Sequence, residues 1–149
     1  MKTNILFICH GNICRSTMAE FVFRYMAEKS GRGDDFYVES AAVSSEEIGS
    51  PVHHGTKKIL DRMGIDCSKK RARKITPEDY DKFDLIVAMD KSNLRLLKYI
   101  IPADCDKKVR LMMDFTDKGG EVADPWYTGD FEQTLTDILD GSKGILAKY

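Results

Sequence analysis

A cysteine and an arginine five residues apart lie near the start of the chain, in the run Cys9-His10-Gly11-Asn12-Ile13-Cys14-Arg15-Ser16. The run follows the apolar residues 5–8 and precedes an amphipathic helical pattern. Backbone amides at a helix N-terminus bind phosphate oxygens. A guanidinium from Arg15, expected on the rim of the loop, suits bidentate contact with phosphate. The spacing therefore predicts a site that binds a phosphate and attacks it with the Cys9 sulfur.

The other residues of this loop fit the same chemistry. A cysteine attacks as its thiolate, which a helix N-terminus and a neighbouring cation stabilise. Gly11 permits close approach of the backbone, Asn12 tolerates a left-handed conformation, and the Ser16 hydroxyl can hydrogen-bond the Cys9 sulfur. We expect the phosphate to be bound by residues His10, Gly11, Asn12, Ile13, Cys14 and Arg15. The G-x-x-x-x-G-K-[ST] pattern of nucleotide-binding loops is absent.

Cleavage of a phosphate ester also needs a proton for the leaving oxygen. Asp124 in the run Asp124-Pro125-Trp126-Tyr127 is the best source, because the following proline favours an extended backbone at Asp124 and lets the carboxyl project. Trp126 and Tyr127 would form aromatic walls for a flat substrate ring. The alternative interpretation is a plain turn with surface aromatics, since Asp-Pro is common in turns.

Alternating strands and helices must position these residues. Apolar or β-rich runs predict strands over 4–9, 36–40, 85–89 and 108–112. Helical patterns separate these strands. The first is capped by Thr17 with Glu20 and ends near Gly31. The others span 56–63, begin at Thr76, span 90–101 and start at Phe131. The glycines at 141 and 144 leave the end of the last helix open. Such alternation indicates an α/β fold, an open parallel sheet with helices on both faces and ligands at the carboxyl ends of its strands.

Bulk properties restrict the class of protein. A chain of 149 residues with 42% hydrophobic and 32% charged residues suggests a single domain spanning 1–149. A net charge of −1 and the absence of a long apolar stretch give no reason to expect nucleic acid or membrane partners. No secretory signal is evident, so we expect a cytoplasmic protein. We also expect a monomer or a weak dimer. Free thiols are then expected at the four cysteines, and a zinc site at Cys9, His10 and Cys14 lacks a nearby fourth ligand.

At these residues the chain resembles the low-molecular-weight protein tyrosine phosphatases. The likeness covers most of the length and rests on the C-x5-R-S loop, Ser40-Ala41, Ala72-Arg73 before Ile75-Thr76, Met89-Asp90 with Ser92-Asn93-Leu94, and Asp124-Pro125. It implies a flavodoxin-like, three-layer fold with a four-stranded parallel sheet in the order 2-1-3-4. It also implies roles: Cys9 as nucleophile, Arg15 as phosphate ligand, and Asp124 as general acid and then base. The expected activity is hydrolysis of phosphotyrosine proteins or aryl phosphates through a cysteinyl-phosphate, with no metal and no cofactor.

Three positions depart from the family pattern. Ala42 replaces a common glycine, and Glu46 in the substrate cleft stands where many members carry an aromatic residue. Lys70 stands where many carry a histidine linked by hydrogen bonds to the serine at position 40 here. Ser16, Asn12 and Ser40 can still connect. The basic run around Lys70 has two interpretations, an altered substrate preference or a solvated face.

Three alternative functions and two interpretations of Cys14 remain to be weighed. An arsenate reductase would need further cysteines near the loop, and Cys67 and Cys105 are single and widely spaced. A protein arginine phosphatase of the same family usually has threonine where this chain has Ile13, which favours an aryl phosphate. The presence of Cys9, Arg15 and Asp124 together argues against a non-catalytic phosphotyrosine-binding module. Finally, Cys14 is either a small buried cysteine or a redox partner that forms a reversible disulfide with Cys9.

Overall fold

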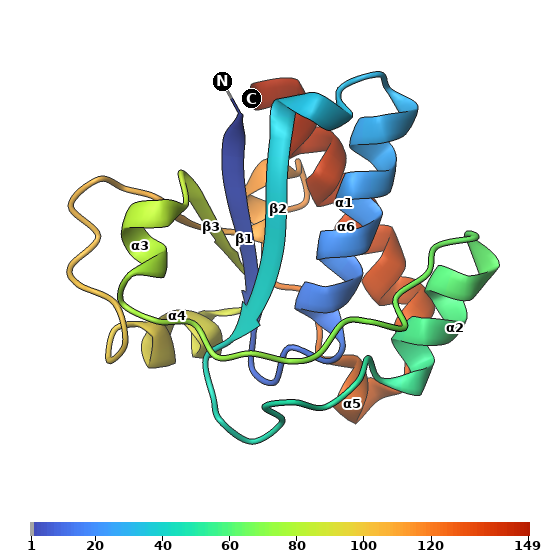
Figure 1. Ribbon diagram of the computed structural model, residues 1–149, viewed down its shortest axis with the longest axis horizontal. Helices are drawn as coiled ribbons and strands as arrows, with labels where there is room; N and C mark the ends of the chain where they lie inside the picture. The colour runs from blue at the N-terminus through green and yellow to red at the C-terminus, as the bar shows by residue number, and fades with distance from the viewer. Residues whose placement is uncertain (1) are drawn as a thin grey trace.

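A four-stranded parallel sheet forms the centre of the protein in a computed structural model that describes residues 2–149 (Figure 1). Its strand order is β2-β1-β3-β4, as the resemblance implied. All pairings are parallel, so the carboxyl ends of the strands meet at one edge of the sheet. The strands are β1 (Thr3–Cys9), β2 (Phe36–Ala42), β3 (Leu85–Ala88) and β4 (Val109–Leu111).

Helices cover both faces of the sheet, as expected for buried parallel strands (Figure 1). One face packs against α1 (Arg15–Lys29), α2 (His54–Arg62) and α6 (Phe131–Lys148). The other face packs against α3 (Asp79–Lys82) and α4 (Lys91–Leu97). Side chains of β1 alternate between the two cores: Ile5, Phe7 and Cys9 enter the first, and Leu6 and Ile8 enter the second. The remaining helices are α5 (Pro125–Thr128) and two 3₁₀ turns, Gly33–Asp35 and Met112–Phe115.

The start of α1 differs from the sequence prediction. The helix begins at Arg15, and its N-cap residue Cys14 makes no side-chain capping bond. Thr17 and Glu20 form no capping box: the Thr17 hydroxyl donates to the carbonyl of Asn12, and Glu20 accepts a hydrogen bond from Ser40. The phosphate loop therefore uses side chains that the local pattern assigned to the helix.

The last helix runs without a break through the two glycines that left its end open. A Cβ atom at Gly144 would lie 1.9 Å from the carbonyl oxygen of Phe115, and one at Gly141 would lie 2.8 Å from the Met112 side chain. Glycine at both positions lets α6 approach the 3₁₀ turn Met112–Phe115 closely. This packing compensates for the low helix propensity of glycine.

Other boundaries shift by a few residues. α4 ends at Leu97 rather than near residue 101, and α3 begins at Asp79, because the Asp79 carboxylate accepts the Thr76 amide at 2.8 Å and holds the turn before the helix. Strand β2 extends to Ala42. Within residues 2–149, no helix is both long enough and apolar enough to cross a membrane.

Candidate active site

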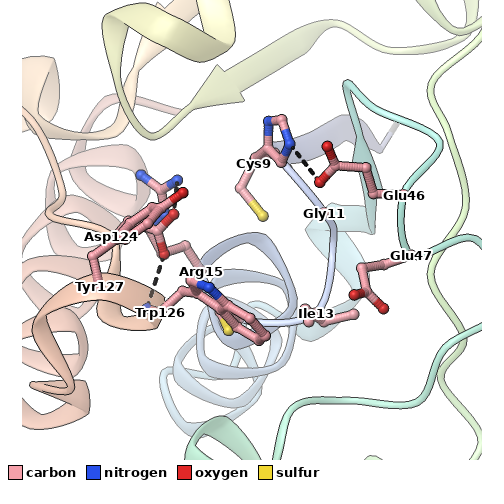
Figure 2. Close-up of a pocket in the computed structure, with 11 residues that line it drawn as sticks. Cys9, Gly11, Ile13, Arg15, Glu46, Glu47, Asp124, Trp126 and Tyr127 are labelled. Atoms are coloured by element: carbon pink, nitrogen blue, oxygen red, sulfur yellow. Dashed lines mark hydrogen bonds and ion pairs between the residues drawn. The ribbon is translucent and has the colours of Figure 1, made fainter.

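A pocket of about 390 Å³ lies at the carboxyl end of β1 (Figure 2). The loop that follows β1 forms its floor, α5 with Asp124 forms one wall, and the segment after β2 forms the other. The lining residues are Cys9, His10, Gly11, Ile13, Cys14, Arg15, Glu46, Glu47, Asp124, Trp126 and Tyr127. The fold thus brings the early cysteine loop and the late Asp-Pro segment, more than 100 residues apart in sequence, to one cavity.

The Cys9 sulfur lies at the floor of this pocket and contacts the Ser16 hydroxyl. Cys9 Sγ and Ser16 Oγ are 3.0 Å apart, and both side chains are buried. Asn12 adopts the left-handed conformation foreseen for it, with φ of 59°. This conformation turns the chain back toward α1, whose amino end begins at Arg15. The positive end of the helix dipole therefore lies beside the sulfur.

Asn12 fixes the direction of the hydrogen bonds below the loop. Its Oδ1 accepts the backbone N–H of Arg73 at 3.2 Å, so its Nδ2 faces the two serines. Nδ2 donates to Ser16 Oγ at 2.8 Å and to Ser40 Oγ at 2.9 Å. An amide nitrogen only donates, so each serine is left to donate its own proton onward. A Cys9 thiolate can only accept, so in that state the proton of Ser16 points to Cys9 Sγ and stabilises it.

Arg15 is buried and does not lie on the rim, contrary to the sequence expectation. Its side chain is 2% exposed, and Nη1 donates to Asp90 at 2.7 Å and to the carbonyl of Val122 at 2.9 Å. Burial alone would lower the pKa of Arg15, but the Cys9 sulfur and the carboxylates of Asp90 and Asp124 raise it. The guanidinium is thus a fixed cation. Its Nη2 makes only a longer contact, 3.4 Å, with Asp124.

Asp124 has the extended backbone expected before proline, with φ of −77° and ψ of 112°. Its Oδ1 accepts the amide of Trp126 at 3.0 Å and caps α5. Its Oδ2 is the atom that faces Arg15. The Asp-Pro segment therefore begins a short helix of four residues. The cap holds the carboxyl over the pocket.

The rim of the pocket has one aromatic side and one acidic side (Figure 2). Trp126 and Tyr127 project from α5 and are 59% and 84% exposed. Across the pocket, Glu46 Oε2 lies 3.0 Å from Nε2 of His10, and Glu47 lines the same wall. The three residues expected in the substrate cleft, Glu46, Trp126 and Tyr127, all line the pocket.

Cys14 is a buried free thiol at the N-cap of α1. Burial raises the pKa of Cys14 to about 12, and repulsion from Cys9 and Asp124 adds to the rise. Cys14 is therefore protonated at neutral pH. In the described part of the chain, no three His, Cys, Asp or Glu side chains converge in an arrangement that would hold a metal ion.

Sequence reasoning missed three residues of this region. Asp90 pairs with Arg15 and also caps α4 through the amide of Asn93. Glu47 lines the pocket, and Glu20 accepts a hydrogen bond from the Ser40 hydroxyl. A buried arginine needs an anionic partner, so a search for carboxylates at the ends of neighbouring strands would have found Asp90, which follows β3. No local signal pointed to Glu20.

Comparison with known proteins gives consistent matches over nearly the whole chain. Residues 4–148 match the family described as low molecular weight phosphotyrosine protein phosphatase. The low molecular weight protein-tyrosine-phosphatase YfkJ of Bacillus subtilis is 38% identical over 97% of this chain and 94% of its own, and its crystal structure superposes with a TM-score of 0.94. The human low molecular weight phosphotyrosine protein phosphatase is 40% identical, with coverages of 97% and 94%. The Streptococcus pyogenes enzyme SP-PTP is 38% identical, with a TM-score of 0.87 and coverages of 99% and 93%.

Proposed function

The chain belongs to the low molecular weight phosphotyrosine protein phosphatases, and from this premise we propose that it hydrolyses phosphotyrosine through a cysteinyl-phosphate on Cys9, without a metal. Residues 1–149 act as one phosphatase domain. The observation that carries the proposal is the convergence of three groups on one pocket: the Cys9 sulfur, the fixed cation of Arg15 and the carboxyl of Asp124. Each supplies a different part of a phosphoryl transfer.

In the first step, the Cys9 thiolate attacks phosphorus from the side opposite the leaving oxygen. The S–P bond forms, the bond from phosphorus to the tyrosine oxygen breaks, and the protonated Asp124 carboxyl gives its proton to that oxygen. Arg15 and the amides of residues 10–15 bind the three equatorial oxygens, whose charge they stabilise. The Ser16 hydroxyl, 3.0 Å from the sulfur, donates a hydrogen bond to the attacking thiolate.

In the second step, the Asp124 carboxylate takes a proton from water as the water oxygen attacks phosphorus. The new O–P bond forms while the S–P bond breaks, which releases inorganic phosphate and restores the Cys9 thiolate and the Asp124 acid. The positive charge needed in both steps comes from the guanidinium and the helix N-terminus, so the proposal assigns no role to a metal.

The substrate is an aryl phosphate on a protein. Trp126 and Tyr127 offer faces for a phenyl ring above the loop, and Ile13 gives the floor an apolar, branched side chain. Phosphoarginine is the competing substrate, and phosphoserine lacks the ring that reaches across the aromatic side. The proposal therefore ranks phosphotyrosine first among the three.

A panel of phosphopeptides tests this proposal. Peptides of one sequence that carry phosphotyrosine, phosphoserine or phosphoarginine are incubated with the enzyme in the presence of a chelator, and phosphate release is measured. We expect hydrolysis of the phosphotyrosine peptide, at a rate that the chelator leaves unchanged. Preferential hydrolysis of phosphoarginine would assign the chain to the other substrate, and loss of activity with the chelator would contradict the metal-independent mechanism.

A further inference from the structure

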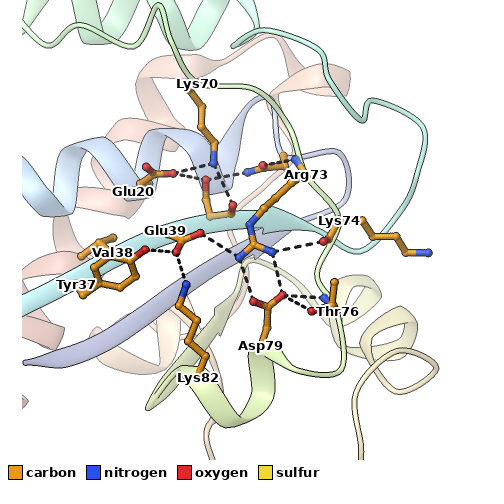
Figure 3. Close-up of polar contacts among 12 residues, drawn as sticks. Glu20, Tyr37, Val38, Glu39, Lys70, Arg73, Lys74, Thr76, Asp79 and Lys82 are labelled. Atoms are coloured by element: carbon orange, nitrogen blue, oxygen red, sulfur yellow. Dashed lines mark hydrogen bonds and ion pairs between the residues drawn. The ribbon is translucent and has the colours of Figure 1, made fainter.

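The short helix α5 starts at the Asp124 carboxyl, yet hydrogen bonds do not tie it to the body of the protein. In the described chain, the hydrogen bonds of residues 125–130 run only among residues 124–134. The segment between α2 and α3, which also contacts the phosphate loop, is instead held by an ion pair between Lys70 and Glu20 (Figure 3). The position of α5 therefore depends on the packing of its side chains.

The ring of His53 packs against the residues at both ends of this segment. It lies edge-on to Trp126, with ring centroids 5.6 Å apart and planes at 72°. It stacks on Phe131, the first residue of α6, with centroids 5.2 Å apart and planes at 16°. Phe131 comes this close because residue 55 is a glycine: a Cβ atom at Gly55 would lie 2.4 Å from the Phe131 ring. One imidazole thus contacts the first turn of α5 and the start of the next helix.

His53 is itself fixed to the phosphate loop and to α2. Its backbone N–H donates to the carbonyl of Ile13 at 2.9 Å. Its ring Nδ1 accepts the N–H of Gly55 at 3.0 Å and caps α2. In the same turn, the Thr56 hydroxyl donates to the carbonyl of Cys14 at 3.2 Å. The imidazole therefore joins the loop beneath the pocket to the helix that begins at the acid.

The contact reaches the Asp124 carboxyl through Trp126. The backbone N–H of Trp126 donates to Asp124 Oδ1 at 3.0 Å (Figure 2). The other carboxylate oxygen, Oδ2, has only the 3.4 Å contact with Arg15. A displacement of Trp126 would therefore move the shorter of the two contacts that orient the acid.

We propose that His53 is a positioning residue for the general acid: its ring holds Trp126 and Phe131, and through them it sets the Asp124 carboxyl over the phosphate loop. The inference rests on the proposed role of Asp124 as the acid. His53 lines a cavity of about 580 Å³ that Trp126 separates from the active-site pocket, and it does not line the pocket itself. It acts through Trp126 and touches neither substrate nor the reacting atoms.

The hydrogen bond from Gly55 requires a neutral His53, because an imidazole protonated at Nδ1 cannot accept. Burial lowers the pKa of His53, the charge of His54 lowers it further, and Glu47 opposes both effects. Asp124 is the ionisable group at the start of α5. The other ionisable groups around the cavity are Lys58, Arg62, Asp130 and Glu132. The ring is thus neutral at neutral pH, and its protonation at lower pH removes the cap.

The first test uses two variants that each keep one part of the role of His53. Asparagine caps helices but has no ring, and phenylalanine has a ring but cannot accept the N–H of Gly55. kcat is measured with phenyl phosphate, a poor leaving group, and with p-nitrophenyl phosphate, a good one. We expect His53→Asn to lower kcat about tenfold for phenyl phosphate, a part of the roughly 10²- to 10⁴-fold contribution of a positioned acid, and less than about twofold for p-nitrophenyl phosphate.

His53→Phe should retain most of kcat for both esters, because the ring that packs on Trp126 is kept, while its Tm falls with the loss of the cap. His54→Asn is the matched control. It removes the adjacent exposed imidazole and leaves His53, Trp126 and Phe131 in place, so kcat should be unchanged for both esters.

The fluorescence of Trp126, the only tryptophan of the chain, reports on His53 without turnover. An imidazolium quenches a neighbouring indole more strongly than a neutral imidazole does. We expect the fluorescence of the parent protein to fall with pH through a midpoint below about 6.5, the ordinary pKa of histidine. His53→Asn and His53→Phe should lack this transition. His54→Asn should move its midpoint upward, because the charge of His54 lowers the pKa of His53.

Three results would overturn the proposal: an unchanged kcat for phenyl phosphate in His53→Asn, equal losses for both esters in that variant, or a fluorescence transition that survives the substitution. A parent enzyme that hydrolyses neither ester would contradict the proposed phosphatase function instead. The fluorescence titration would still decide in that case whether His53 holds Trp126, so the two failures are distinguishable.

Discussion

The floor and the rim of the pocket are built in opposite ways. On the floor, Cys9, Asn12, Arg15 and Ser16 are at most 3% exposed, and each polar side chain has a partner. On the rim, Trp126 and Tyr127 are mostly exposed, and Glu46 is held by one exposed contact with His10. The floor is therefore fixed by the same packing that forms the domain core, whereas the rim is free to change without cost to the fold.

This difference assigns chemistry and selectivity to separate regions. A buried hydrogen-bonded group that loses its partner costs about 1–3 kcal/mol, and an exposed ion pair contributes about 0–1 kcal/mol. Substitutions on the floor should thus affect the reaction itself, and substitutions on the rim should affect which phosphate ester reacts.

Cys9→Ser is expected to abolish turnover, by about 10³-fold or more, because a serine hydroxyl is far less ionised than the thiol. The oxygen keeps the size and the contact with Ser16, so the free energy of unfolding should change by less than about 1 kcal/mol. Phosphate release from an aryl phosphate and a urea melt measure the two quantities. Appreciable turnover by Cys9→Ser would show that the floor does not carry the nucleophile.

Asp124→Asn should lower kcat about 10²- to 10⁴-fold for a poor leaving group, because the amide cannot donate a proton to the phenolic oxygen. Asparagine can still accept the amide of Trp126, so α5 keeps its cap. The loss should be smaller for p-nitrophenol, a leaving group that needs less protonation. Asp140→Asn, an exposed carboxylate on α6, is the matched control. Equal losses for both leaving groups would exclude Asp124 as the acid.

The two loop cysteines should differ sharply in reactivity. With its pKa raised to about 12, Cys14 has about one thiolate in 10⁴ molecules at pH 8, and its alkylation should increase about tenfold per pH unit up to that value. We expect iodoacetamide to modify Cys9 and the exposed Cys105 first, as read by peptide mass spectrometry. Because Cys9 repels the Cys14 thiolate, Cys9→Ser should speed the reaction of Cys14. Rapid modification of Cys14 at pH 8 would contradict its burial.

The same order of reactivity bears on the redox hypothesis. Peroxide should oxidise Cys9 to a sulfenic acid first, and attack by Cys14 on that sulfur would release water and form a Cys9–Cys14 disulfide. Mass spectrometry after mild peroxide treatment detects the linkage. If Cys9 instead accumulates as sulfinic acid with no linked peptide, Cys14 is only a buried cysteine of the floor.

Much of the fold follows from local patterns in the sequence. The continuous apolar runs of β1 and β3 predicted strands buried on both faces, and the structure places both in the middle of the sheet. The continuation of α6 through Gly141 and Gly144 could not be predicted, because helix propensity counts both glycines as destabilising. The benefit of those glycines is close contact with Met112 and Phe115, which lie in a different segment.

The candidate site also has a part that local patterns in the sequence indicate and a part that distant contacts determine. The residues of the loop and Asp124 could be named from their types and spacing, because their chemistry is local. No local pattern indicated that Arg15 is buried or that Glu20 accepts from Ser40, since their partners Asp90 and Lys70 are distant in sequence. Ion pairs between separate elements leave no periodic signal, and Glu20 fits a capping box as well as it fits a hydrogen-bond chain.

Glu46→Gln should give the smallest effect and the sharpest test of the rim. The pair with His10 is exposed, with 71% of the Glu46 side chain accessible, so its loss should change stability by less than about 1 kcal/mol. The kcat for p-nitrophenyl phosphate should stay within about twofold. We compare kcat/KM for a phosphotyrosine peptide with a flanking lysine to kcat/KM for one with a flanking glutamate. The ratio of the first to the second should fall about two- to fivefold in Glu46→Gln, because one carboxylate beside the pocket is removed. High salt should reduce the same ratio in the parent enzyme. Asp140→Asn should leave the ratio unchanged. A tenfold loss of kcat in Glu46→Gln would show that the rim takes part in the chemistry and that the two regions are not separable.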